Sequence, residues 1–308
     1  MAAAWLLGAS LLAAIGGCAA PGTGPASAQL SSARFCDRPQ VQDARQQDRI
    51  LRFAAVIRQE LEASGEEVAL ISRSGVDLRD IGIRFSHSGL TFREGGDVPW
   101  SVRQLYYACD EGKPRLYDQG IAGFLFNGDE PAVGYVSILL LPPEPALALR
   151  RAALDRQRAL RLLAGHYSAN AYPFSTRYQN CNQWVVELMA AAWGGLADGD
   201  DLRERAQAWL AASGYDPVPV DLDSHPLKFA AVFMPLVHLD DHPEEARHGL
   251  QFQVSLPATI ETFVHERMPQ ARRVELCHDE HRIVIRRGWR PIAEGCREED
   301  GDRVIPLG

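Results

Sequence analysis

The chain has 308 residues, close to half of them apolar, and about a quarter charged. This balance is typical of a globular protein with one large domain. The formal net charge of -8 argues against a nucleic-acid-binding protein, because neutralising phosphates requires a clustered basic surface.

The first residues predict a secretory signal. An apolar stretch ends at Ile15 and is too short to span a bilayer, as in the central region of a signal peptide. Two processing sites compete. The run from Ile15 to Cys18 resembles a lipobox, in which Cys18 is lipidated, whereas Ala26-Ser27-Ala28 resembles a signal-peptidase site. We therefore expect an exported protein, periplasmic or anchored as an outer-membrane lipoprotein, whose only contact with the membrane is that anchor.

We expect three parts: a signal with its tether (1–28), a core (29–215) and a C-terminal extension of the same domain (216–308). Helical spacing of apolar residues predicts a helix over 41–64. Alternation predicts strands over 81–93 and 100–109, and two apolar runs, IAGFLF and AVGYVSILLL, also favour strands. Further helices are predicted over 148–165, after Cys181, over 201–214 and in TIETFVHERM, followed by a C-terminal hairpin.

The six cysteines leave one thiol unpaired. Without Cys18, five remain, and an exported protein tends to pair them. Cys277 and Cys296 flank the predicted hairpin, and Cys36 and Cys109 form a second possible pair, although other pairings stay open. Cys181 is then the free thiol.

Cys181 is predicted to lie in the first turn of a helix, in YQNCNQWVVELMA. The unpaired N–H groups and the helix dipole favour a thiolate there. Asn180 fits the helix cap, and Tyr178 and the N–H of Cys181 are candidate oxyanion donors.

A base and an orienting group are predicted on neighbouring strands. His87 lies on the inward face of its strand, and Gln104 is expected directly or diagonally opposite it if the two strands form a hairpin. Nucleophile, base and orienting group are the three parts that cysteine catalysis needs. A buried cysteine, a core histidine and a strand-bridging glutamine are the structural alternative.

The histidine-rich segments suggest a second type of site. His238, His242 and His248 in HLDDHPEEARH have ligand-like spacing, as does the Cys277-His278 pair with His281. Pro243 disfavours a continuous helix, and no H-E-x-x-H motif is present. We therefore expect loop histidines and a disulfide, with neither a metal nor an organic cofactor.

FSHSGL, followed about 90 residues later by NCNQWVVEL, resembles the circularly permuted papain-like enzymes, which include lecithin–retinol acyltransferase and permuted relatives of the NlpC peptidases. The phrases FCDRP, SGVDLRDIGIRFSHSGL and YQNCNQWVVELMAAAWG look like the bacterial family called domain of unknown function 2145.

The first resemblance implies an α+β, permuted papain-like fold in which an antiparallel sheet packs on the nucleophile helix, with a C-terminal β-rich extension. It implies Cys181 as nucleophile and His87 as base; Gln104 stands where that group more often has His or Glu. The function expected is hydrolysis or acyl transfer at amide or ester bonds of the envelope, with a peptidoglycan peptide or a lipid acyl group as substrate. The alternative is a non-catalytic envelope module.

Overall fold

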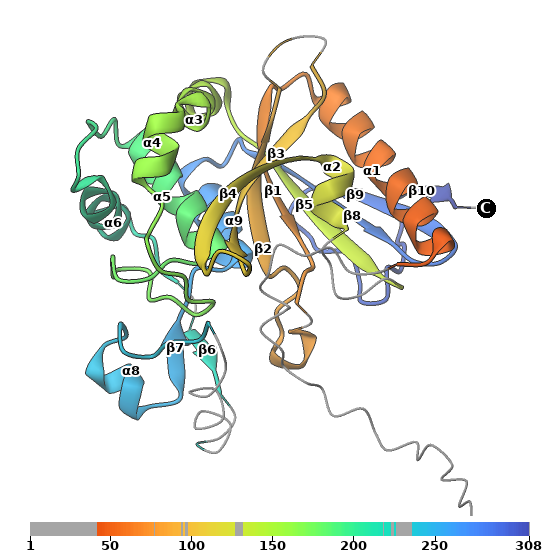
Figure 1. Cartoon of the computed structure of the whole chain (residues 1–308). Helices are drawn as coiled ribbons and strands as arrows, with labels where there is room; N and C mark the ends of the chain where they lie inside the picture. The colour runs from red at the N-terminus through yellow and green to blue at the C-terminus, as the bar shows by residue number, and fades with distance from the viewer. Residues whose placement is uncertain are drawn as a thin grey trace, which may run out of the picture. The chain divides into compact units, whose positions relative to one another are not determined.

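An eight-stranded antiparallel sheet forms the centre of the structure (Figure 1). The structure is a computed structural model that describes residues 42–307 except 77, 94, 96–97, 127–131, 218, 223–224 and 226–235. The strand order is β10-β9-β8-β5-β1-β2-β3-β4. The strands are β1 (Val68–Arg73), β2 (His87–Phe92), β3 (Ser101–Ala108), β4 (Lys113–Gly120), β5 (Gly134–Leu140), β8 (Arg272–His278), β9 (Arg282–Arg287) and β10 (Arg303–Pro306).

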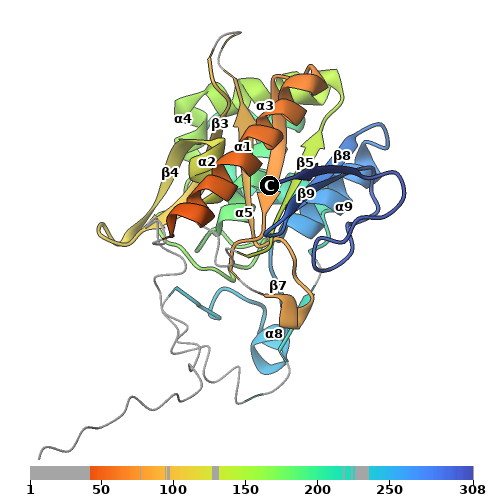
Figure 2. The same ribbon diagram turned by 90° about the vertical axis from the view of Figure 1, so that its right-hand side faces the viewer.

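Helices cover both faces of this sheet (Figure 2). One face, called the α1 face here, carries α1 (Ala44–Ser64) and α2 (Ile121–Leu125). The opposite face, called the α5 face, carries α3 (Pro143–Leu154), α4 (Arg156–Arg161), α5 (Cys181–Trp193), α6 (Leu202–Ala212) and α9 (Pro257–Arg267). The other elements of the described residues are η2 (Arg79–Ile81), α8 (Glu244–His248) and a two-stranded sheet of β6 (Pro219–Asp221) and β7 (Gln251–Gln253).

Strand alternation explains why the sheet has two cores. In β1, Leu70 packs with α5 whereas Ile71 packs with α1, because successive side chains point to opposite faces. On β2, Leu90 belongs to the core on the α5 face, with Trp184. With both faces covered, β1 is buried along its whole length, as expected for a central strand of a two-sided sheet.

The structure confirms a mixed α and β fold with a large antiparallel sheet, but it differs from the sequence prediction in several segments. The single helix predicted over 148–165 is divided into α3 and α4 at Asp155. The run IAGFLF contains helix α2 instead of the predicted strand. Strand β4, which precedes this helix, was not predicted. The strand predicted over 81–93 begins only at His87, since the chain before it forms the short helix η2 and turns at Gly82, whose φ is 74°. A short apolar run does not distinguish a buried helix from a strand.

The C-terminal strands belong to the same sheet as the rest. β8 pairs with β5 along seven residue pairs, so segment 272–306 completes the sheet. Among the described residues, no helix is long and apolar enough to cross a membrane.

Candidate functional site

Cys181 is the first residue of α5, as predicted. The side chain of Asn180 caps the helix by accepting a hydrogen bond from the N–H of Gln183 at 2.7 Å. The thiol is free, buried and only 6% exposed. Its Sγ lies 4.0 Å from the carbonyl oxygen of Ser86, the residue before β2.

A buried ion pair holds the loop that leads to Cys181. Glu187 is fully buried on α5 and accepts hydrogen bonds from Arg203 at 2.8 and 3.0 Å. Arg203 also donates to the carbonyl oxygens of Thr176 and Tyr178. Buried charges persist where they are paired and hydrogen-bonded, so this pair fixes the approach to the helix. The Glu187–Arg203 ion pair could not be predicted from the sequence, because the two residues lie on different helices and only the fold brings them together.

His87 and Gln104 do come together. His87 Nε2 lies 2.7 Å from Gln104 Oε1, and Gln104 Nε2 donates to Gln119 Oε1 at 2.7 Å. Continuing the β2–β3 register places Gln104 opposite Gly89, diagonal to His87. Because an amide oxygen only accepts, Nε2 of the neutral ring carries the proton and Nδ1 keeps its lone pair. Within the described chain, Nδ1 forms no hydrogen bond.

The imidazole and the thiol approach the same point of β2 from different sides. His87 stacks on Tyr106 with ring centroids 4.6 Å apart and also packs against Phe124 of α2, on the α1 face. Cys181 belongs to the core of the α5 face, which receives the alternate residues of β2. In the described part of the structure, no hydrogen bond joins the thiol to the imidazole.

Burial keeps both groups neutral at rest. It raises the pKa of Cys181 to about 11, although the N–H groups of Ser88 and Asn182 and the charge of Arg73 oppose this rise. Burial and the charge of Arg73 together lower the pKa of His87 to about 3, against the hydrogen bond to Gln104. Desolvation therefore outweighs the effect of the helix terminus, and the thiolate expected from the sequence is not the resting form.

Arg73 is a buried cation beside both groups. It is 3% exposed and donates to the hydroxyl of Tyr106 and, at 3.1 Å, to the carbonyl oxygen of Ser74. Its Nε has no hydrogen-bond partner, and it forms no ion pair with the residues that the structure describes. A buried guanidinium without a carboxylate is suited to stabilising negative charge that forms nearby.

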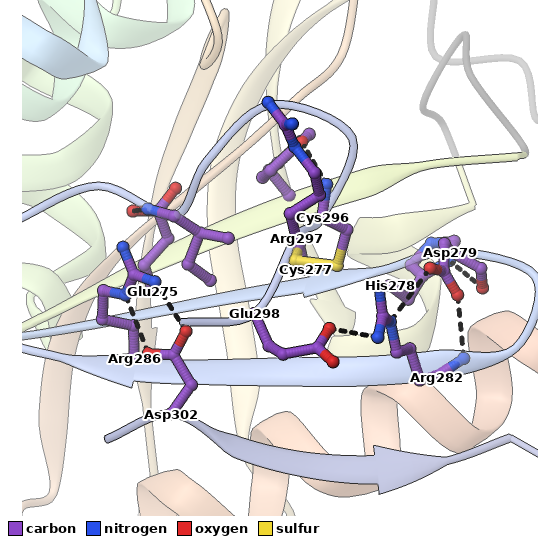
Figure 3. The surroundings of a disulfide bond; sticks show 12 residues. Glu275, Cys277, His278, Asp279, Arg282, Arg286, Cys296, Arg297, Glu298 and Asp302 are labelled. Carbon is purple, nitrogen blue, oxygen red and sulfur yellow. Dashed lines mark hydrogen bonds and ion pairs between the residues drawn. A yellow bond between two sulfur atoms is a disulfide. The ribbon is translucent and has the colours of Figure 1, made fainter. Parts of the chain in front are cut away.

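The cysteine pairing agrees with the prediction where it is described. Cys277 and Cys296 form a disulfide beside the Arg286–Asp302 ion pair (Figure 3). Cys109 is also disulfide-bonded, and its predicted partner, Cys36, lies outside the described residues, as do Cys18 and the predicted signal.

The histidine-rich segments form no metal cluster among the described residues. His238 stacks on Tyr178 with ring centroids 4.5 Å apart. The hydroxyl of Tyr178 donates to Asp240 Oδ2 at 3.4 Å, so the side chain of Tyr178 is hydrogen-bonded to the loop 236–243.

Residues 60–264 match the family described as "Uncharacterized protein conserved in bacteria (DUF2145)", and the chain belongs to this family. Searches of the curated proteins and of the solved structures found no match to the chain.

Proposed function

We propose that the protein is a cysteine hydrolase or acyltransferase with a permuted papain-like fold, exported to the bacterial envelope, where it acts on amide or ester bonds. The observation that carries the proposal is the position of a free thiol at the start of α5. This thiol contacts the backbone beside His87, whose imidazole is oriented by Gln104.

The proposed chemistry begins from the neutral pair. Nδ1 of His87 takes the proton of the Cys181 thiol as the sulfur attacks the acyl carbon, and the same proton then passes to the leaving amine or alcohol. Water, or an acceptor alcohol or amine, releases the acyl group from the thioester. Because the thiol and imidazole are not hydrogen-bonded at rest, this step requires His87 to turn toward the α5 face when substrate binds.

Four neighbours suit this chemistry. Gln104 holds Nε2–H in the resting protein, which sets Nδ1 as the acceptor before the ring turns and this hydrogen bond is released. The N–H groups of Ser88 and Asn182 lie close enough to the thiol to lower its pKa, and the charge of Arg73 acts in the same direction. These groups favour the negative charge that develops during attack.

A non-catalytic envelope module is the second candidate. The high pKa of Cys181, the low pKa of His87 and the missing hydrogen bond between them favour it. In that function the thiol is a buried apolar residue and the imidazole a part of the sheet interior.

Acyl-enzyme formation separates the two candidates. The whole chain is incubated with p-nitrophenyl esters and peptide p-nitroanilides, and the adduct mass on Cys181 is measured by mass spectrometry. The enzyme gives an adduct that Cys181→Ser abolishes and that a chelator leaves unchanged. A protein without an adduct for any member of the panel is the binding module.

A further inference from the structure

A groove lies between η2, β6 and α9. Its volume of about 1120 Å³ exceeds the roughly 300–1,000 Å³ of a typical small-molecule pocket. Apolar side chains form a large part of its lining: Ile81, Ile83, Val220, Leu256 and Trp289. Ile81 is 37% exposed, although it is a large apolar residue. Apolar surface that is exposed and gathered in one groove is typical of a binding site for a large partner.

Three carboxylates from three different elements line the same groove. Asp80 lies on η2, Asp221 on β6 and Glu266 on α9, and all three residues are exposed. None of the three carboxylates forms an ion pair or a hydrogen bond with a residue that the structure describes. Their negative charge is therefore available to a ligand in the groove.

The basic side chains of the groove already have partners. Arg84 pairs with Glu275 at 2.8 Å, and Arg273 pairs with Glu261 at 2.8 Å and with Glu275 at 2.9 Å. Arg79 is also engaged in an interaction. The uncompensated charge of the groove is therefore negative, and a groove with charge of one sign attracts ligands of the opposite sign.

A free strand edge runs along the groove. In the described chain β6 pairs only with β7, and its three residues, Pro219, Val220 and Asp221, all line the groove. Successive side chains of a strand point to opposite faces, so three lining residues in a row place the edge of β6 toward the groove. Leu222 donates to Leu250 just beyond β6, and the alternation of the ladder then leaves the N–H and C=O of Asp221 pointing away from β7. An extended peptide can pair with such an edge.

One end of the groove lies beside the segment that holds Cys181. The carbonyl oxygens of Ser86 and Ser255 both accept from Asn182 Nδ2, at 3.2 and 3.0 Å. The residue before Ser86 and the residue after Ser255 line the groove. Because the Cys181 thiol contacts the same Ser86 carbonyl at 4.0 Å, a ligand at this end lies close to the backbone that surrounds the thiol.

We propose that this groove binds an extended peptide segment in which basic and apolar side chains alternate. The basic side chains meet the three free carboxylates, the apolar side chains contact the apolar lining, and the peptide backbone pairs with the edge of β6. A fatty acyl chain matches the apolar lining alone, because it has neither a positive charge nor a backbone to pair. The binding does not depend on catalysis, whereas the conclusion that Cys181 acts on a peptide amide instead of a lipid rests on the proposed function.

The test is a binding titration with the whole Cys181→Ser chain, in which no thioester can form. The probes are the N-acetylated, amidated pentapeptide Lys-Val-Lys-Val-Lys, its analogue with Glu in place of Lys, and octanoyl-glycine as a fatty acyl probe. Isothermal calorimetry gives Kd at low and at high salt. We expect the lysine peptide to bind at least about tenfold more tightly than either other probe. Its advantage over the glutamate peptide should shrink at high salt, since exposed charges are screened there.

Charge-matched variants locate the site. The triple variant Asp80→Asn, Asp221→Asn, Glu266→Gln removes the three groove carboxylates at nearly constant size, and it should weaken binding of the lysine peptide at least about tenfold. The control changes the net charge equally by replacing three exposed carboxylates outside the groove: Glu144→Gln, Asp200→Asn and Glu245→Gln. The control should leave Kd nearly unchanged, and thermal unfolding shows that both triple variants are folded.

Equal affinity for the lysine and glutamate peptides, tighter binding of octanoyl-glycine, no binding of any probe, or the same Kd in the two triple variants would overturn the proposal. The acylation assay is read separately. A lysine peptide that binds in the groove, in a protein whose wild type forms no acyl adduct, supports the groove and contradicts the hydrolase. An adduct with other substrates, without binding of the lysine peptide, contradicts the groove alone.

Discussion

His87 should make the protein lose stability as the pH falls, because its pKa is lowered from 6.5 to about 3 in the folded state. Between these two values the unfolded chain binds a proton that the folded protein does not. The free energy of unfolding therefore decreases with decreasing pH, by about 1.4 kcal/mol per pH unit. From pH 7 to pH 4.5 the loss due to His87 amounts to about 2.5 kcal/mol.

The assay compares urea unfolding of the wild type and of His87→Gln at both pH values. When the pH is lowered from 7 to 4.5, the unfolding free energy of the wild type should fall by about 2.5 kcal/mol more than that of His87→Gln. Burial also lowers the pKa of His278, to about 4. Because His278 is present in both proteins, its contribution to the pH dependence cancels when the two are compared. A difference that does not change with pH would refute the assignment of His87 as a buried, neutral imidazole.

Three further predictions concern α5 and the C-terminal hairpin. Alkylation of Cys181 by iodoacetamide in the ligand-free protein should accelerate with pH up to about 11 and be a few hundred-fold slower at pH 7 than for a free thiol of pKa about 8.5; a plateau below pH 9 would argue against the neutral resting thiol. Glu187→Ala, which leaves Arg203 buried without its partner, should lower the unfolding free energy by about 3 kcal/mol or more in chemical denaturation, and a change below about 1 kcal/mol would mean that the pair is dispensable. Replacing both Cys277 and Cys296 by serine should cost about 3 kcal/mol, given their separation of 19 residues, and an unchanged melting temperature would contradict this.

Local signals predicted most of what lies near Cys181. The apolar spacing and Asn180 identified the start of α5, and alternation identified β2 and β3 with Gln104 diagonal to His87. These features depend on residues that are close in the sequence or that belong to one hairpin, so local sequence patterns are sufficient to predict them.

The side to which His87 points could not be predicted. Alternation shows that it faces inward, but both faces of this sheet are buried, so the pattern does not tell which face receives α5. The burial that raises the pKa of Cys181 has the same origin, since it comes from tertiary packing. The sequence analysis missed Arg73 for a related reason: that its guanidinium forms no ion pair with the described residues is visible only after folding.

The proposed function depends on a thioester that Cys181 forms with His87 as its base. The most direct measurement is intact-protein mass spectrometry after rapid mixing with the best acyl substrate of the panel, on the wild type, His87→Ala and Cys181→Ser. We expect an acyl adduct that forms in the wild type, forms at least about 100-fold more slowly in His87→Ala and is absent in Cys181→Ser. Equal rates of acylation in the wild type and His87→Ala, or no adduct in the wild type, would contradict it.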